Sequence, residues 1–421
     1  MMNISQKFES ERNRHLLENV SYITVLQMFN VIAPLITYPY LVRVIGRDRY
    51  GVFITAQVLV SYISLFVIWG SDSVCAKYIS IHRDDKQKLS EIFSSVLAGR
   101  AMMWFLGLLT YLLIVYLTPT YRESSLVFVL TYGMVLFDVL FPQYLFQGLE
   151  KMKYATFVVV MVRLLFIMLV FTLVRDSSDL YRVPLLYSIG YLLGGLASLY
   201  VIFCRLGLRL TKVSGGKVLS LVKESSPIFA SDLITAIKDR FNILLMGGLI
   251  GMANVVVYDL GMKINLLVTK PTEILRIALF PRAAKDRSIP EVRRTMIVSF
   301  LISVLLVAMV NAALPYIVRL FLNEDIDLLP LRLFSMAPLL LSVSVLIAFN
   351  VFVAFGYNKY VLNSILITTG CYLLLLISCY FTHHLNTLMI FVLISMVAYL
   401  VEFIYRVVMF KKIVRKTLSQ G

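Results

Sequence analysis

The chain has 421 residues, of which 59% are hydrophobic and 15% charged, with a mean hydropathy of +0.84. An average soluble domain holds about 45–50% apolar and about 25% charged residues, so the composition excludes a soluble protein and predicts a polytopic membrane protein. The net charge of +16 does not indicate nucleic-acid binding, because the basic residues are not gathered on one polar domain and the positive-inside rule explains most of them.

Twelve apolar stretches are long enough to cross a membrane, since a spanning helix needs about 20 predominantly apolar residues. We therefore expect an all-α polytopic membrane protein with about twelve transmembrane helices. The stretches run approximately over residues 20–45, 51–74, 92–117, 124–146, 155–174, 183–204, 227–247, 254–280, 295–321, 329–355, 360–381 and 387–410.

The longest inner connection divides these stretches into six and six. It places apolar Val218 and Leu219 among Lys217, Lys223 and Glu224, which predicts a short amphipathic helix lying in the membrane interface. The expected organisation is therefore an N-terminal six-helix bundle, a cytoplasmic amphipathic linker, a C-terminal six-helix bundle and a basic tail. Their ranges are 1–204, 205–226, 227–410 and 411–421.

Basic residues in the connections predict the orientation. Of 40 basic residues, ten lie within the apolar stretches and six in outer connections if the amino terminus is inside, which leaves 24 on the inner side (40 − 10 − 6). This bias predicts that both termini are cytoplasmic. The polar amino-terminal segment is too long for a cleavable signal peptide. The six outer residues, with Arg43 at the outer end of the first stretch counted among them, are Arg43, Arg47, Arg49, Arg122, Arg175 and Arg182.

A weak internal repeat indicates that the two halves are related. Ile45-Gly46 precedes Tyr50 at the first outer turn of the first half, and Ile250-Gly251 precedes Tyr258 at the equivalent turn of the second half. Transporters commonly contain such faint repeats, with the substrate path at the interface between them. The pattern favours two pseudo-symmetric bundles around a central cavity.

Cations within the apolar stretches are the strongest functional signal. A cation in hydrocarbon costs roughly 2.5–3.5 kcal/mol on the most lenient scale, so it normally faces a bundle interior or a wet cavity. Some have local explanations: Asp259 with Lys263 and Glu402 with Arg406 are spaced i,i+4 for ion pairs within one helix. The ten cations are Arg100, Arg163, Lys238, Arg240, Lys263, Lys270, Arg276, Arg319, Arg332 and Arg406.

Four of these cations have no sufficient local partner. Arg100 and Arg163 have no acid within one helical turn that would neutralise them, and Asp239 cannot neutralise both Lys238 and Arg240. We predict that these four line a cavity for a phosphate-bearing substrate, because arginine forms strong charge-assisted bonds with phosphate. The alternative is interhelical ion pairing.

Acids and prolines in the same stretches supply further candidates. Asp138, Asp239, Asp259 and Glu273 are candidates for coupling to H⁺ or Na⁺, or for ion pairing, with Arg163–Asp138 as one interhelical alternative. Proline kinks a helix, so three prolines within the stretches are predicted gating kinks. These prolines are Pro34, Pro39 and Pro271.

Several other classes of site are not expected. The four cysteines are scattered through apolar segments, and Cys371 and Cys379 are roughly 12 Å apart along a helix, which is too far for a disulfide. The four histidines form no spaced ligand set, so no metal and no cofactor are predicted. No G-x-x-x-x-G-K-[ST] loop is present, which argues against ATP hydrolysis by this chain.

Particular strings resemble a known family. They include VIGRDRYGVF at 44–53, FPQYLFQGLEKMKYAT at 141–156 and LFPRAAK at 279–285, the most specific being the run through Pro142, Gln147, Gly148 and Glu150. They resemble the polysaccharide transporter branch of the multidrug/oligosaccharidyl-lipid/polysaccharide exporter superfamily. The resemblance implies a non-enzymatic flippase in the bacterial inner membrane that moves an undecaprenyl-diphosphate-linked glycan, such as an O-antigen unit of lipopolysaccharide, to the periplasmic leaflet by alternating access.

The same resemblance implies partners and leaves alternatives open. The partners would be the lipid-linked glycan, membrane lipids and the polymerase and chain-length proteins of the pathway. A drug or cation antiporter of the same superfamily is one alternative, although residues 20–45 lack the acid such antiporters often use. A membrane-embedded glycan polymerase or glycosyltransferase is another, but only short acidic loops, NEDIDL outside and RDDKQK inside, would serve it.

Overall fold

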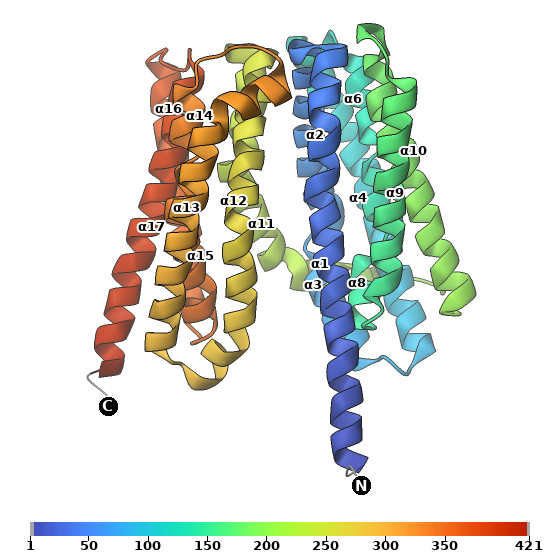
Figure 1. The fold of residues 1–421 in the computed structure, drawn as a ribbon. Coiled ribbons are helices and arrows are strands. Elements are labelled where there is room, and N and C mark those ends of the chain that lie inside the picture. The colour runs from blue at the N-terminus through green and yellow to red at the C-terminus, as the bar shows by residue number, and fades with distance from the viewer. Residues whose placement is uncertain (1–3, 419–421) are drawn as a thin grey trace. The chain divides into compact units, whose positions relative to one another are not determined.

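The computed structural model describes residues 4–418, and it is helical without strands in that range (Figure 1). The chain divides into two compact units, Met1–Asp232 and Leu233–Gly421. The helices that begin in the first unit are α1 (Ile4–Ile45), α2 (Arg47–Ile68), α3 (Ser71–Ile81), α4 (Lys86–Leu117), α5 (Pro119–Arg122), α6 (Ser125–Tyr132), α7 (Val135–Leu140), α8 (Gln143–Gly148), α9 (Met152–Leu173), the 3₁₀ helix η1 (Ser177–Tyr181), α10 (Arg182–Tyr200), the π-helix η2 (Val201–Arg205) and α11 (Gly215–Leu249).

The second unit contains the end of α11 and the remaining helices. Its π-helical turn η3 directly continues α15. The helices are α12 (Met252–Asp286), α13 (Ile289–Leu322), α14 (Leu329–Phe334), α15 (Ala337–Ile347), η3 (Ala348–Val353), α16 (Asn358–Phe381) and α17 (Leu388–Leu418).

The long helical segments confirm the membrane fold expected from the sequence. Ten segments in the described chain are long and apolar enough to cross a membrane. α11 and α12 are not among these ten, but each is 35 residues long and carries the charges of the predicted seventh and eighth spans. Together they make twelve long helical segments (10 + 2) in residues 4–418.

Two predicted spans are broken where the sequence interrupts the backbone hydrogen bonds. The span predicted at 124–146 consists of α6, α7 and α8, and α7 ends two residues before Pro142. Proline has no N–H and disfavours the α conformation in the residue before it, so a helix ends there. The span predicted at 51–74 turns at Trp69 and Gly70, both with positive φ, between α2 and α3.

The two turns of the internal repeat share one backbone conformation. Gly46, between α1 and α2, has φ 86° and ψ 153°. Gly251, between α11 and α12, has φ 92° and ψ 152°. This region is accessible essentially to glycine alone, and the tyrosine that follows each turn, Tyr50 or Tyr258, is buried. The short sequence match therefore corresponds to a structural match at both turns.

The connection predicted as a separate amphipathic helix has a different structure. After η2 the backbone is non-helical up to Ser214, and its amides at Arg209 and Thr211 donate to the hydroxyls of Ser90 and Ser94 on α4 at 3.1 and 3.0 Å. α11 then runs from Gly215 to Leu249 without a break. The apolar residues Val218 and Leu219 thus lie in the first turns of a long helix, and their place in the membrane interface stays a prediction.

The first half of α11 packs within the first unit. The ring of Phe229 stacks on Trp69 with centroids 3.9 Å apart, and the Trp69 Nε1–H donates to Ser226 Oγ at 3.1 Å. At Gly70 an added Cβ would lie 2.9 Å from the Ser225 carbonyl oxygen, so only glycine permits this approach of α11 to the turn after α2.

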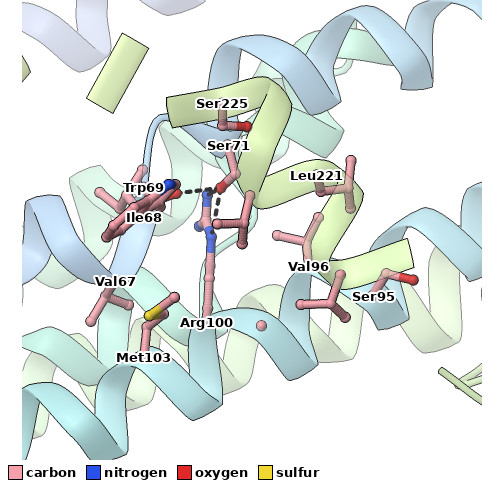
Figure 2. A pocket seen from close by; sticks show the side chains of 13 residues that line it. Val67, Ile68, Trp69, Ser71, Ser95, Val96, Arg100, Met103, Leu221 and Ser225 are labelled. Atoms are coloured by element: carbon pink, nitrogen blue, oxygen red, sulfur yellow. Dashed lines mark hydrogen bonds between the residues drawn. The ribbon is translucent and has the colours of Figure 1, made fainter. Parts of the chain in front are cut away.

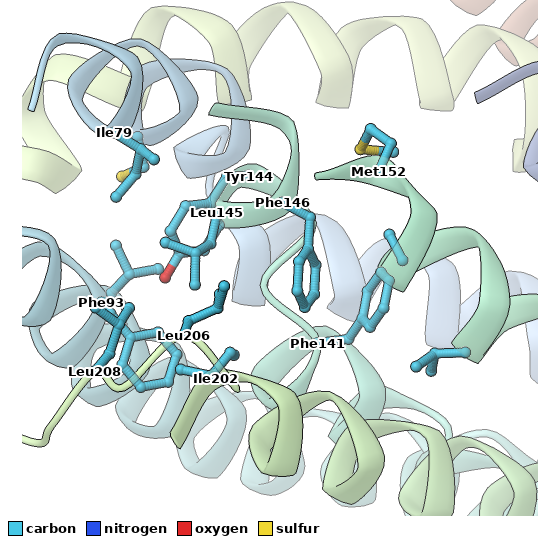
Figure 3. Close-up of a cluster of buried hydrophobic side chains, with 14 of the residues drawn as sticks. Ile79, Phe93, Phe141, Tyr144, Leu145, Phe146, Met152, Ile202, Leu206 and Leu208 are labelled. Carbon is cyan, nitrogen blue, oxygen red and sulfur yellow. The ribbon is translucent and has the colours of Figure 1, made fainter. Parts of the chain in front are cut away.

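A buried cluster in the first unit joins α3, α4, α8, α9 and η2 (Figure 3). Phe93, Tyr144 and Phe146 are at most 1% exposed, and Ile202 is fully buried. Burial of each such side chain contributes about 1.5–3 kcal/mol in water. The cluster also includes residues next to two of the predicted site cations. The Arg100 guanidinium lies over the ring of Tyr144, and Phe141 lines the same cavity as Arg163.

Candidate functional site

Arg100 is buried, and its guanidinium is bonded to Ser71 at the edge of a small pocket (Figure 2). Its guanidinium lies 2.6 Å from Asp72 Oδ1 and donates to Ser71 Oγ at 2.9 Å and to the Asp138 carbonyl oxygen at 2.8 Å. Its guanidinium carbon is also 5.2 Å from the ring centroid of Tyr144. The adjoining cavity is only about 30 Å³, which is about the liquid volume of one water molecule. Arg100 therefore belongs to an interhelical ion pair.

Lys238 belongs to a second buried network, in the second unit. Its Nζ lies 2.7 Å from Glu402 and 3.5 Å from Asp239, and Glu402 also pairs with Arg406 at 2.6 Å. Arg406 Nε donates to Ser364 Oγ at 3.1 Å. Two cations and two carboxylates balance here. The predicted i,i+4 pair of Glu402 and Arg406 is confirmed, and Lys238 is neutralised mainly by an acid on another helix.

Arg240 differs from its neighbour Lys238. Its side chain is exposed, and it forms no ion pair with any residue in the range 4–418. The sequence argument that Asp239 cannot serve both cations is confirmed, because Asp239 contacts Lys238 and leaves Arg240 on the surface of the second unit.

Arg163 lies in a cavity that contains no carboxylate. It is the twelfth of the 22 residues of α9, and no acid in residues 4–418 lies within ion-pair distance of it. Its polar neighbours are neutral: Nη2 is 3.4 Å from Asn30 Oδ1, and the guanidinium carbon is 5.5 Å from the Tyr191 ring centroid. Its buried Nε has no hydrogen-bond partner among the described residues. With only neutral partners among the described side chains, the guanidinium carries a positive charge that no carboxylate compensates.

The Arg163 cavity, defined by the side chains around this guanidinium, has a volume of about 190 Å³ in the first unit. This corresponds to about six water molecules at about 30 Å³ each, which leaves room for a phosphoryl group. Its polar groups are amides, a phenol and the guanidinium, so it carries one positive charge. Its lining residues are Leu26 and Asn30 of α1, Phe137 of α7, Phe141, Gln143 of α8, Val159, Val162 and Arg163 of α9, and Tyr191 of α10.

The four candidate acids are not equivalent. Asp259 pairs with Lys263, as the spacing predicted, and Glu273 pairs with Lys270 at 2.6 Å. Asp239 pairs with Lys238. The Asp138 carboxylate accepts from the Ser64 hydroxyl. It forms no ion pair within the described chain, and its backbone carbonyl rather than its side chain contacts Arg100. The interhelical pair Arg163–Asp138 is therefore not formed.

The predicted gating prolines lie inside continuous helices. α1 passes through Pro34 and Pro39, and α12 passes through Pro271. Pro34 cannot supply the helical hydrogen bond to the carbonyl of Asn30, the residue of α1 that faces Arg163. The Thr37 hydroxyl donates to the Pro34 carbonyl at 3.2 Å. α1 therefore lacks one backbone hydrogen bond next to the Arg163 cavity. A gating role for the prolines stays a prediction.

Sequence reasoning missed the neutral members of the Arg163 cavity. Asn30, Gln143 and Tyr191 come from three helices far apart in the sequence, and a single amide or phenol in an apolar stretch carries no distinctive signal. The sequence feature that could have pointed to this cavity is the pair Asn30 and Pro34, a polar residue and a proline one turn apart on α1. Asp72, the partner of Arg100, lies on another helix, and its pairing depends on the packing of α3 against α4.

Comparisons with known proteins agree in placing the chain among membrane transporters of one fold. The family model described as "Polysaccharide biosynthesis protein" matches residues 16–285. Two curated proteins, both named "Putative O-antigen transporter", are similar. The one from Escherichia coli K12 is 24% identical over 86% of this chain and 89% of its own length, and the one from Shigella dysenteriae is 23% identical over 64% and 67%.

Solved structures give the fold. An inward-facing multidrug resistance MATE family transporter of the MOP superfamily has a TM-score of 0.69 at 13% identity, covering 94% of this chain and 99% of the other. An outward-facing multidrug resistance MATE family transporter of the same superfamily has a TM-score of 0.58 at 17% identity, covering 94% of each chain. At such low identity, these likenesses show the fold alone.

Proposed function

Because the chain belongs to the polysaccharide biosynthesis protein family, we propose that it is a flippase for an undecaprenyl-diphosphate-linked oligosaccharide, an O-antigen or related repeat unit. It moves this substrate from the cytoplasmic to the periplasmic leaflet by alternating access. Two relatives named as O-antigen transporters support the substrate class. The polymerase and chain-length proteins that use such units are the proposed partners.

The Arg163 cavity is the observation that carries this proposal. A diphosphate brings negative charge into the membrane, and the cost falls when a guanidinium supplies charge-assisted hydrogen bonds. The positive charge of Arg163 is not compensated by any acid in the cavity lining, and the cavity can hold a phosphoryl group. Arg240, exposed and without an ion pair in the described chain, is a second candidate contact. Arg100 and Lys238 instead hold helices together.

Replacing Arg163 by Met should reduce flipping roughly tenfold or more, because a charge-assisted bond contributes about 1.5–3 kcal/mol and about 1.4 kcal/mol is a factor of ten. Flipping is measured by the protection of labelled lipid diphosphate oligosaccharide in proteoliposomes. R163K should recover only part of the activity, since lysine lacks the planar fork. R319M, which changes an exposed arginine of α13, is the control. Wild-type flipping by R163M would exclude this role for the cavity.

The driving force is proposed to be substrate supply together with the membrane potential. An inside-negative potential of 100 mV favours outward movement of an anion by about 2.3 kcal/mol per charge. Asp239, Asp259 and Glu273 each have a lysine partner, so Asp138, which forms no ion pair within the described chain, is the one candidate acid left for coupling to H⁺ or Na⁺. Flipping in proteoliposomes should persist without either ion gradient. If it stops when one gradient is removed, an ion drives the cycle.

The proposed location is the bacterial cytoplasmic membrane, with both termini in the cytoplasm. The bias of 24 inner against six outer basic residues supports this orientation. A green fluorescent protein fused to the C-terminus should then be fluorescent, and an alkaline phosphatase fusion inactive. The reverse pair of results would exclude a cytoplasmic C-terminus.

A further inference from the structure

The second unit contains a polar cavity that the Arg163 site does not use. It has a volume of about 240 Å³ and lies between α12 and the α15–η3 segment. Four of its polar residues, Thr269, Thr272, Glu273 and Arg276, follow the spacing i, i+3, i+4, i+7 and so share one face of α12. Ser342 of α15 and Phe349 of η3 face them.

Arg276 has donors available to a ligand. Its guanidinium carbon lies 4.3 Å from the ring centroid of Phe349. Among the described side chains it forms no ion pair, and no hydrogen bond from its side chain to another described residue is present. Its backbone is fixed instead, because the fully buried Asn350 donates from Nδ2 to the Arg276 carbonyl at 3.0 Å. The ring and the amide both come from the π-helical turn η3, a feature common at functional sites.

Glu273 and Thr269 can accept hydrogen bonds from a ligand. The Glu273 carboxylate is 34% exposed and pairs with Lys270 through Oε2 alone. Thr269 uses its hydroxyl proton on the backbone of its own helix, at 2.9 Å to the Asn265 carbonyl, which leaves oxygen lone pairs. Lys270 and Glu273 cancel in charge. The cavity therefore has one net positive charge at Arg276 and a carboxylate one turn away.

We propose that this cavity is a subsite for one anionic sugar of the transported glycan, an inference that rests on the proposed flippase function. Sugar hydroxyls donate to the Glu273 carboxylate and to Thr269, while the negative group of the sugar, a phosphate or a carboxylate, binds Arg276. A bare phosphate fits less well, because it has no sugar hydroxyls to donate to the Glu273 carboxylate and to Thr269. An uncharged sugar leaves Arg276 unpaired.

Binding of small probes to the purified full-length chain in nanodiscs tests this. Isothermal titration calorimetry with glucose 1-phosphate, glucuronate, inorganic phosphate and glucose should rank at least one charged sugar roughly tenfold above both phosphate and glucose. Preference for glucose 1-phosphate identifies the sugar–phosphate junction as the ligand, and preference for glucuronate identifies an acidic sugar. Equal binding of phosphate and both charged sugars would overturn sugar recognition, and equal binding of glucose and the charged sugars would overturn anion recognition.

Two variants separate the two parts of the subsite. R276M keeps an apolar stem over Phe349 and should remove the preference for charged sugars over glucose. T269V keeps the shape of the side chain and should weaken charged sugars several-fold without changing phosphate binding. R332M, an exposed arginine of α14 in the same unit, is the matched control. Retention of the preference by folded R276M would overturn the proposal.

The test of this subsite and the test of the proposed function can fail separately. R163M is assayed for flipping and R276M for sugar binding. If R163M flips normally while R276M loses its sugar preference, the Arg163 role fails and the subsite stands. If R163M abolishes flipping while R276M binds charged sugars as the wild type does, the subsite fails and the Arg163 role stands.

Discussion

Glu402 is shared by two buried cations, and its removal tests what such a network contributes. The side chains of Lys238, Glu402 and Arg406 are 8%, 6% and 6% exposed. Transfer of these charges out of water is costly, and mutual pairing offsets the cost only while the partners are complete. The network is therefore a point where one substitution has a large effect.

Glu402→Gln should destabilise the protein by about 3–5 kcal/mol, because it leaves two buried cations with only Asp239 nearby. The readout is thermal unfolding in detergent. Glu91→Gln is the comparison: Glu91 pairs with Lys217 at 2.8 Å, but this pair is open to solvent, so its loss should change the unfolding midpoint far less. Similar unfolding midpoints for the two variants would show that the buried network does not stabilise the second unit.

Residue pairs also show what could be predicted from the sequence. Asp259–Lys263 and Glu402–Arg406 were predicted because i,i+4 spacing on a helix fixes proximity without any tertiary information. Arg100–Asp72 and Lys238–Glu402 were not, because their partners lie on other helices. The hypothesis that all four unpaired cations line one cavity was too broad. Of these four, Arg163 is the one that the structure places in the lining of a cavity without an acidic partner among the described side chains.

At the scale of elements, glycines on α10 set how closely it packs against α9. An added Cβ at Gly194 would lie 2.6 Å from Val162 Cγ2 and 3.1 Å from the ring of Phe137, whereas one at Gly190 would lie 3.5 Å from Val162. The pattern of small residues four apart indicates a close helix contact, and the structure confirms it. Val162 and Phe137 also line the Arg163 cavity.

Gly194→Ala should therefore destabilise the first unit by about 1–3 kcal/mol through overpacking. It should also impair flipping, because Val162 must move beside Arg163. Gly190→Ala meets only ordinary contact and should be neutral or stabilising, since alanine favours a helix by about 1 kcal/mol over glycine. Thermal unfolding and flipping assays on both variants provide the comparison. An unchanged midpoint for G194A would contradict the packing argument.

At the scale of the whole molecule, hydropathy predicted the helical membrane fold because lipid exposure demands long apolar helices. It did not predict that α11 continues from the inner connection into the seventh span, since polar residues such as Lys223 and Glu224 are compatible with either a surface helix or the start of a longer one. The cavities could not be predicted from the sequence for a different reason. They depend on side chains such as Asn30 and Tyr191 that meet only after packing.

The stacking of Trp69 on Phe229 gives this protein a built-in optical signal. The chain contains two tryptophans, Trp69 and Trp104, and both lie in the first unit. Trp104→Phe would leave Trp69 as the single tryptophan. Its ring centroid lies 3.9 Å from that of Phe229, and its Nε1–H donates to Ser226 on α11. Its fluorescence would follow the attachment of α11 to the turn after α2 during transport, without any added label.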